Sequence, residues 1–126
     1  MDFGILAPLF IALGAIPGAL SRYYLTLFCT KKFGSSFPYG TMIINLSGAF
    51  LMGFFATLFQ SVNAPYLSLL ITVGFLGSYT TFSTYQLETW SLIGTGNYKK
   101  ALLYWIGSAV LGFLCVEIGM FLARQL

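Results

Sequence analysis

Residues 74–85 read Gly-Phe-Leu-Gly-Ser-Tyr-Thr-Thr-Phe-Ser-Thr-Tyr, and they lie inside an apolar segment long enough to cross a bilayer. The two glycines are followed by a run of hydroxyl side chains that begins at Ser78. This composition predicts an interrupted helix, because glycine costs about 1 kcal/mol relative to alanine in a helix and because serine and threonine can bond the local backbone instead. Backbone groups released from a helix cannot face lipid, so a break survives only where it lines a cavity, meets another chain or holds an ion. We therefore expect the function to reside at this break.

The composition is that of an integral membrane protein. Of the 126 residues, 58% are hydrophobic and 7% are charged, and the mean hydropathy is +0.86. Four apolar stretches, at roughly 3–28, 39–60, 66–92 and 99–124, each exceed the ~20 residues that a membrane helix needs. We predict an all-α, multi-pass protein of the inner (plasma) membrane, in which residues 1–126 form a single domain of four transmembrane helices with a broken third helix.

Several classes of function are disfavoured by the charged and reactive residues. The net charge of +3 comes from six basic and three acidic residues, which are too few and too scattered for a nucleic-acid surface. The chain has no histidine, and Cys29 and Cys115 lie far apart, which argues against a zinc or redox cluster and favours two buried thiols. An enzyme is not expected, because the sequence offers no recognisable pair of a nucleophile and a general base. A four-helix chain of this size has little room for an internal pathway, which indicates an oligomer.

The first span carries a small-xxx-small pattern from Gly14 to Gly18, which predicts the close approach of another helix. Arg22 follows four residues later, near the end of the span. Its guanidinium can snorkel to the interface beside the neighbouring tyrosines. It can equally attract anions at a pore mouth. The residues alone leave both interpretations open.

Two other spans have polar side chains on one helical face. Thr41, Asn45 and Gly48 are spaced at i, i+4 and i+7 in the second span. A lone asparagine in a membrane helix is most often an interhelical hydrogen-bond partner worth about 1 kcal/mol. Tyr104 and Ser108 are one turn apart in the fourth span, where helix packing explains the serine adequately.

Aromatic rings follow the expected break. Phe82 and Tyr85 are spaced at i and i+3, with Glu88 three residues further on. Rings at helical spacing are usually packing residues, although their edges carry partial positive charge and can favour an anion. Glu88 is interpreted as an interfacial carboxylate that could pair with Arg22.

Three stretches of this chain resemble motifs of the Fluc (CrcB-type) fluoride channels. The hexad Thr-Thr-Phe-Ser-Thr-Tyr at 80–85, after Gly-x-x-Gly, is similar to the third-helix signature of that family. Residues 14–23 resemble its Gly-x-x-x-Gly-Ala-x-x-Arg-Tyr motif, and residues 40–48 resemble its Gly-Thr-x-x-x-Asn-x-x-Gly motif. The resemblance covers most of the chain, and Tyr85 replaces the usual second phenylalanine.

The resemblance implies a fluoride-selective channel that exports fluoride passively and protects the cell from its toxicity. It implies an antiparallel, dual-topology homodimer with two pores and with Arg22 in the vestibule. It also implies a structural Na+ between two subunits, bound by the backbone carbonyls of Gly77 and Thr80. The side chains that it assigns to the pore are Asn45, Phe82, Ser83, Thr84, Tyr85, Tyr104 and Ser108. The expected partners are fluoride, a second copy of the chain and the lipid bilayer, without nucleic acid.

Charge in the short loops argues to some degree against dual topology. Lysines at 31, 32, 99 and 100 fall on one side of the expected bundle and Arg124 on the other, which should bias that lysine-rich side towards the cytoplasm. The alternative functions are a small multidrug-type exporter and a non-transporting membrane assembly subunit. Proton-coupled drug export wants an acid embedded in the first helix, and residues 3–28 contain none.

Overall fold

The computed structural model describes residues 4–126, and within that range the chain is helical with no strand. Four segments are long and apolar enough to cross a membrane. They are α1 (Leu6–Phe33), α2 (Tyr39–Ser61), a composite third segment (Pro65–Gly94) and α6 (Tyr98–Arg124). The prediction of an all-α, four-span membrane protein is confirmed.

The first helix is longer than its apolar composition predicted. It continues to Phe33, where Gly34 ends it with a positive φ of 77°. Lys31 and Lys32 lie in its last turn, where positive charge interacts favourably with the helix dipole. The apolar stretch of the sequence ends before the helix does, because the last turns of α1 extend towards the membrane surface.

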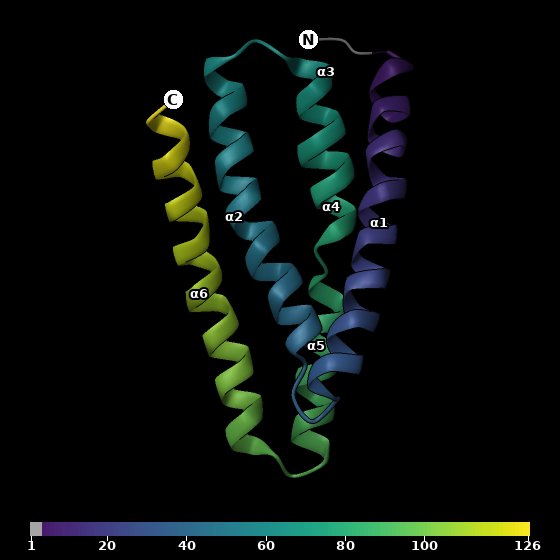
Figure 1. The fold of residues 1–126 in the computed structure, drawn as a ribbon, viewed down its shortest axis with the longest axis vertical. Helices are drawn as coiled ribbons and strands as arrows, with labels where there is room; N and C mark the ends of the chain where they lie inside the picture. The colour runs from purple at the N-terminus through teal and green to yellow at the C-terminus, as the bar shows by residue number, and fades with distance from the viewer. Residues whose placement is uncertain (1–3) are drawn as a thin grey trace.

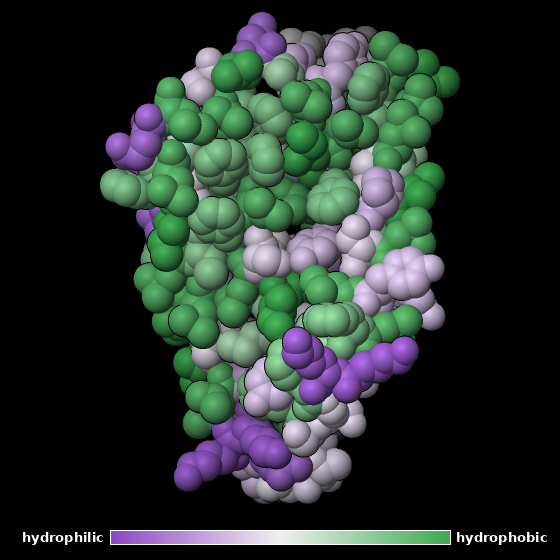
Figure 2. All heavy atoms as spheres, viewed as in Figure 1, coloured by the Kyte–Doolittle hydropathy of each residue, from purple (hydrophilic) through white to green (hydrophobic). Residues whose placement is uncertain are grey.

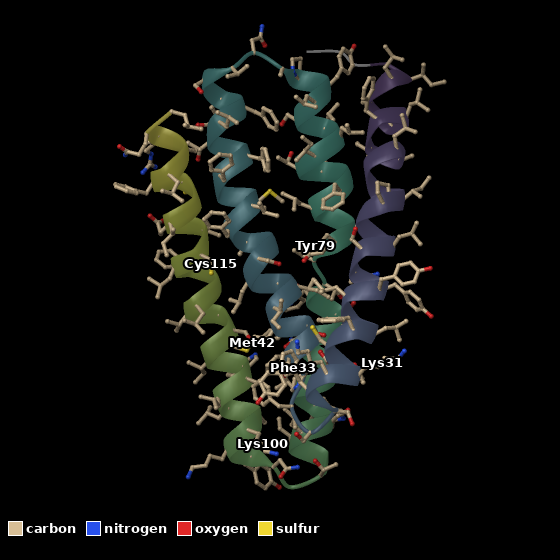
Figure 3. The ribbon with its side chains drawn as sticks, in the orientation of Figure 1. Lys31, Phe33, Met42, Tyr79, Lys100 and Cys115 are labelled. Atoms are coloured by element: carbon tan, nitrogen blue, oxygen red, sulfur yellow. The ribbon has the colours of Figure 1, made fainter. Side chains whose placement is uncertain are left out.

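The four segments lie side by side, and successive segments run in opposite directions (Figure 1). The C-terminus and the α2–α3 connection are at one end of the bundle, and the α1–α2 and α5–α6 connections are at the other. Lys31 and Lys100 accordingly lie at the same end (Figure 3), whereas Arg124 ends α6 at the opposite one. Figure 2 shows a hydrophobic surface over the middle of the visible face, with hydrophilic residues gathered towards the two ends. This is the surface that a bilayer requires.

The third segment is interrupted, as the sequence predicted. It consists of α3 (Pro65–Ser68), the π-helical η1 (Leu69–Leu76), the short α4 (Gly77–Tyr79) and α5 (Phe82–Gly94). Between α4 and α5, Thr80 (φ −80°, ψ 157°) and Thr81 (φ −148°, ψ 115°) are extended. These two residues lie about halfway along the segment, so the helix is broken near the middle of the membrane.

Of the two causes inferred from the sequence, the hydroxyl groups of Thr80 and Thr81 do bond the local backbone at the break, whereas the glycines do not unwind the helix. Gly74 and Gly77 lie within helical turns, and the chain unwinds three residues after the second glycine. A side chain at Gly74 would collide with the backbone of α1 at Ile11. Gly74 is therefore a packing residue, and the break is fixed by contacts of the threonines that follow.

The small-xxx-small pattern of the first span works as predicted. A Cβ atom on Gly14 would overlap the carbonyl oxygen of Leu70, and one on Gly18 would overlap that of Phe75. Missing side chains therefore let α1 lie directly against η1, in the manner of closely packed membrane helices. The pair α2 and α6 pack in the same way, through Gly53 and Gly119.

Candidate functional site

The break is held from the side by Asn45 on α2. Its Nδ2 donates to the carbonyl oxygen of Thr81 at 2.9 Å, and the Thr81 amide donates to its Oδ1 at 2.9 Å. In an extended residue the N–H and C=O groups point to the same side, so one primary amide can pair with both. A second hydrogen on Nδ2 remains for another acceptor. Asn45 thus replaces, for one residue, the hydrogen bonds of a helix.

Two more residues of α2 contact the broken segment. Gly48 lies against the methyl group of Thr80, so closely that a Cβ atom would overlap it. Ser47 shares a hydrogen bond of 2.9 Å with the hydroxyl of Tyr79, which lies immediately before the unwound piece of ribbon (Figure 3). One face of α2 therefore supports the chain before and at the break.

A hollow of about 460 Å³, here called the mid-membrane hollow, opens beside the break between α2, α5 and α6. It brings together four of the residues assigned to the pore, which are Asn45, Phe82, Tyr85 and Ser108. Gly112 also lines it and has nothing within 4 Å of an added Cβ atom. The Oγ of Ser108 is buried and has no hydrogen-bond partner in the described part of the chain. The hollow therefore combines apolar walls with unused hydrogen-bonding capacity.

Aromatic rings lead from this hollow towards the lysine-rich end. The ring centroids of Phe82 and Tyr85 are 5.9 Å apart, and Tyr85 meets Tyr104 edge-on at 5.2 Å. Tyr104 in turn meets Phe37 edge-on at 5.5 Å. Phe82 is 71% exposed, whereas Tyr104 is fully buried. The rings thus form a continuous series from the surface at mid-span to the loop before α2.

The hydroxyl groups of the two tyrosines have defined partners. That of Tyr85 donates to the backbone carbonyl of Trp105 on α6. That of Tyr104 donates to Glu88 at 3.1 Å. Glu88 and Thr41 line a second pocket of about 370 Å³, here called the mouth pocket, formed largely by loop residues and hydroxyl side chains at the lysine-rich end. The tyrosines therefore separate the mouth pocket from the mid-membrane hollow.

Two backbone carbonyls at the break have lost the donors that a helix would give them. The Thr81 amide, which would bond to Gly77, donates to Asn45 instead. The Thr84 amide, which would bond to Thr80, donates to the Thr81 hydroxyl at 3.3 Å. Gly77 is exposed, and only the carbonyl oxygen of Thr72, at 3.9 Å, approaches the position of its missing side chain. Carbonyls of unwound membrane helices are typical ligands of Na+, so this backbone fits the predicted cation.

Comparison with known families decides the classification. The family model described as CrcB-like protein, Camphor Resistance (CrcB), matches residues 9–120. The chain belongs to the CrcB family. The family predicted from the three sequence motifs is therefore confirmed.

Curated relatives of this CrcB chain match almost its whole length. A protein of Synechococcus sp. is 54% identical over 119 residues, which cover 93% of this chain and 92% of the relative. One of Trichormus variabilis is 52% identical over 120 residues, covering 93% and 88%. One of Synechocystis sp. is 48% identical over 128 residues, covering 100% and 98%. Each of the three is named fluoride-specific ion channel FluC.

Four residues assigned to the pathway of this CrcB chain line neither the mid-membrane hollow nor the mouth pocket, and they are Tyr104, Ser83, Thr84 and Arg22. Ser83 and Thr84 are exposed on α5, and the Thr84 hydroxyl accepts a hydrogen bond of 3.0 Å from Thr81. Arg22 is half-buried in α1, and its carbonyl accepts from Thr26. The helix runs about 16 Å beyond Arg22 and ends at Phe33. The pore and vestibule roles of these residues stay predictions.

Sequence reasoning left Glu88 without a firm role in this CrcB chain. The suggested partner was Arg22, whereas the observed hydrogen-bond donor is Tyr104 on α6. The available signal was the spacing of Phe82, Tyr85 and Glu88 along one helical face, which places the carboxylate on the side of the aromatic series. The partner itself could not be found, because nothing in the sequence places α6 next to that face.

Proposed function

We propose that this chain is a fluoride-selective channel that lets fluoride leave the cell passively and so protects it from fluoride toxicity. The observation that carries the proposal is the 48–54% identity, over nearly the whole chain, to relatives named fluoride-specific ion channel FluC. The four membrane-capable segments support a multi-pass position in the plasma membrane. The relatives are named as channels, so no catalytic step is proposed.

The mid-membrane hollow supplies what a small, strongly hydrated anion needs. Such an ion gives up water only where donors replace it. The Ser108 hydroxyl and the second Nδ2 hydrogen of Asn45 are neutral donors, and the exposed Phe82 offers a positive ring edge. Neither this hollow nor the mouth pocket is lined by lysine or arginine. A path without a fixed positive charge binds the ion weakly enough to release it.

The proposed assembly is an antiparallel, dual-topology homodimer with two pores. Support comes from the surface beside the break, where the Phe82 ring is 71% exposed and the polar Ser83 and Thr84 are exposed as well. Polar side chains halfway across a membrane are stabilised by protein contacts rather than by lipid, and a second copy would provide them. The lysine-rich end opposes this arrangement, because positive residues favour the cytoplasmic side. A reporter fused to the C-terminus tests it, and detection on one membrane face alone would contradict dual topology.

A structural Na+ is proposed at the contact between the two copies. The backbone carbonyls of Gly77 and Thr80 would hold it, together with the same carbonyls of a second copy. When bound, the ion offsets the partial negative charge of carbonyls left open by the break. It would fix the two broken segments against each other without being transported.

Flux from proteoliposomes tests the proposed function directly. Purified protein in liposomes loaded with fluoride should release it at a rate proportional to protein content, as an ion-selective electrode reports. Chloride-loaded vesicles are the matched control and should retain their ion. Equal release of both halides, or of neither, would contradict a fluoride-selective channel. The exporter alternative is not favoured, since α1 carries no acidic residue between Leu6 and Phe33.

A further inference from the structure

We propose that Asn45 is the positioning residue that creates the cation site, because it takes the amide hydrogen that would otherwise close the helix onto the carbonyl of Gly77. The inference rests on the proposed structural Na+ and assigns its affinity to a side chain that does not touch it. The sequence predicted Asn45 either as an interhelical hydrogen-bond partner or, from the family resemblance, as a pore-lining residue. The hydrogen bonds of the break give it a second role.

The first step concerns the donor that Gly77 lacks. In a continuous helix the amide of Thr81 would bond to the carbonyl of Gly77, four residues earlier. Here that amide donates to Oδ1 of Asn45 at 2.9 Å. Thr81 is only 8% exposed, so its backbone is largely shielded from bulk water. Removing the Asn45 side chain therefore leaves a choice between an unpaired N–H group in the membrane and a return to the bond with Gly77.

The second step concerns the donor that Thr80 lacks. The Thr81 hydroxyl caps α5, because the Thr84 amide donates to it instead of to the Thr80 carbonyl. This cap requires the extended conformation of Thr81, which Asn45 stabilises by pairing with both of its backbone groups. The Asn45 side chain therefore leaves the Gly77 carbonyl without its helical donor, and the Thr81 side chain does the same for the Thr80 carbonyl.

The third step shows that α2 is shaped for this task. Gly48 lacks the side chain that would overlap Thr80, so α2 can approach the break closely enough for Asn45 to reach it. The Ser47 hydroxyl shares a hydrogen bond with the hydroxyl of Tyr79, the residue that precedes the break. Residues 45, 47 and 48 of α2 thus contact residues 79, 80 and 81. Contacts from α2 therefore stabilise the break in addition to the local sequence of the third segment.

The experiment compares two substitutions that divide the roles of the amide. Asn45→Leu removes both hydrogen bonds to Thr81 while keeping a side chain of similar size. Ionised aspartate in Asn45→Asp keeps an oxygen acceptor for the Thr81 amide but cannot donate to the Thr81 carbonyl or to an anion. Two quantities are measured on the full chain in lipid nanodiscs, by NMR: hydrogen exchange of the Thr81 amide, and the Na+ dissociation constant from the Na+ dependence of the amide shifts at the break.

Asn45→Leu should weaken Na+ binding by about tenfold, whereas exchange of the Thr81 amide should stay slow, because that amide now bonds to the Gly77 carbonyl. Asn45→Asp should keep Na+ affinity within about threefold of wild type while losing fluoride flux, because the amide of Thr81 still has its acceptor. Asn63→Leu, in the exposed connection between α2 and α3, is the control and should change neither quantity. This separation of Na+ affinity from flux would not arise from a general loss of folding.

A second pair of variants tests the same site through Thr81, should Asn45→Leu not fold. Thr81→Val removes the hydroxyl that caps α5, which returns the Thr84 amide to the Thr80 carbonyl and should weaken Na+ binding. Thr81→Ser keeps the hydroxyl and should bind Na+ with wild-type affinity. Unchanged Na+ affinity in both Asn45→Leu and Thr81→Val would overturn the inference. Wild-type protein without any Na+ response would instead contradict the proposed Na+ itself, so the two failures are distinguishable.

Discussion

The hydroxyl of Tyr85 on α5 donates to the backbone carbonyl of Trp105 on α6, and the Tyr85 ring meets Tyr104 edge-on. The hydroxyl thus connects two helices, while the ring takes part in the aromatic series. Tyr85→Phe should therefore lower the free energy of unfolding by about 1 kcal/mol and leave fluoride flux largely unchanged. Thermal unfolding in detergent and liposome flux measure the two effects. Tyr98→Phe, at an exposed ring, is the control. Loss of flux in Tyr85→Phe would show that the hydroxyl itself contacts the ion.

Phe82 is the most exposed ring of the aromatic series and lines the mid-membrane hollow. Phe82→Ile keeps an apolar side chain but removes the ring edge that can face an anion. We expect fluoride flux to be abolished, with the elution volume of the purified protein unchanged. Phe121→Ile, an exposed ring near the end of α6, is the matched control. Wild-type flux in Phe82→Ile would remove this ring from the pathway.

Ser108 separates a role in conduction from a role in packing. A buried hydroxyl with no protein partner adds little to stability, so Ser108→Ala should unfold at the wild-type temperature or slightly above it. If the hydroxyl donates to fluoride, the same variant should conduct about tenfold more slowly. Ser61→Ala, at the exposed end of α2, is the control for both measurements. A marked loss of stability without a change in flux would place the hydroxyl in packing.

Two glycines beside the mid-membrane hollow should respond in opposite ways to the same substitution. An added Cβ atom at Gly48 would overlap Thr80, whereas at Gly112 nothing lies within 4 Å. Gly48→Ala should therefore destabilise the protein by about 1–3 kcal/mol and displace the break. Gly112→Ala should be neutral or slightly stabilising, since alanine favours the helix. Equal unfolding temperatures for the two variants would contradict the close approach of α2 to Thr80.

The parts of the fold that depend on local sequence were predictable. Long apolar runs define membrane helices by length and hydropathy alone, and the pattern from Gly14 to Gly18 indicates close packing wherever a partner lies. The run of hydroxyl residues identified the interruption of the third segment. Its position was harder to predict, because Gly74 is used for packing against Ile11 and not for unwinding.

The contacts that make the site were not predictable in the same way. Asn45 and Thr81 are separated by 36 residues, and Glu88 and Tyr104 by 16. Each pair depends on how two helices are rotated about their axes, which the hydropathy of a nearly uniform apolar helix does not determine. An asparagine that opens a helix and one that only joins two helices have the same sequence signature. Only the geometry distinguishes them.

The lysines at one end of the bundle give each copy an electrically asymmetric shape. Lys31 and Lys32 end α1, and Lys99 and Lys100 begin α6 at the same end, whereas Arg124 is alone in the last turn opposite. Two copies inserted in opposite directions would present identical charge to both solutions. Current carried by such a pair would have the same magnitude at positive and negative voltages, whereas a parallel pair would rectify.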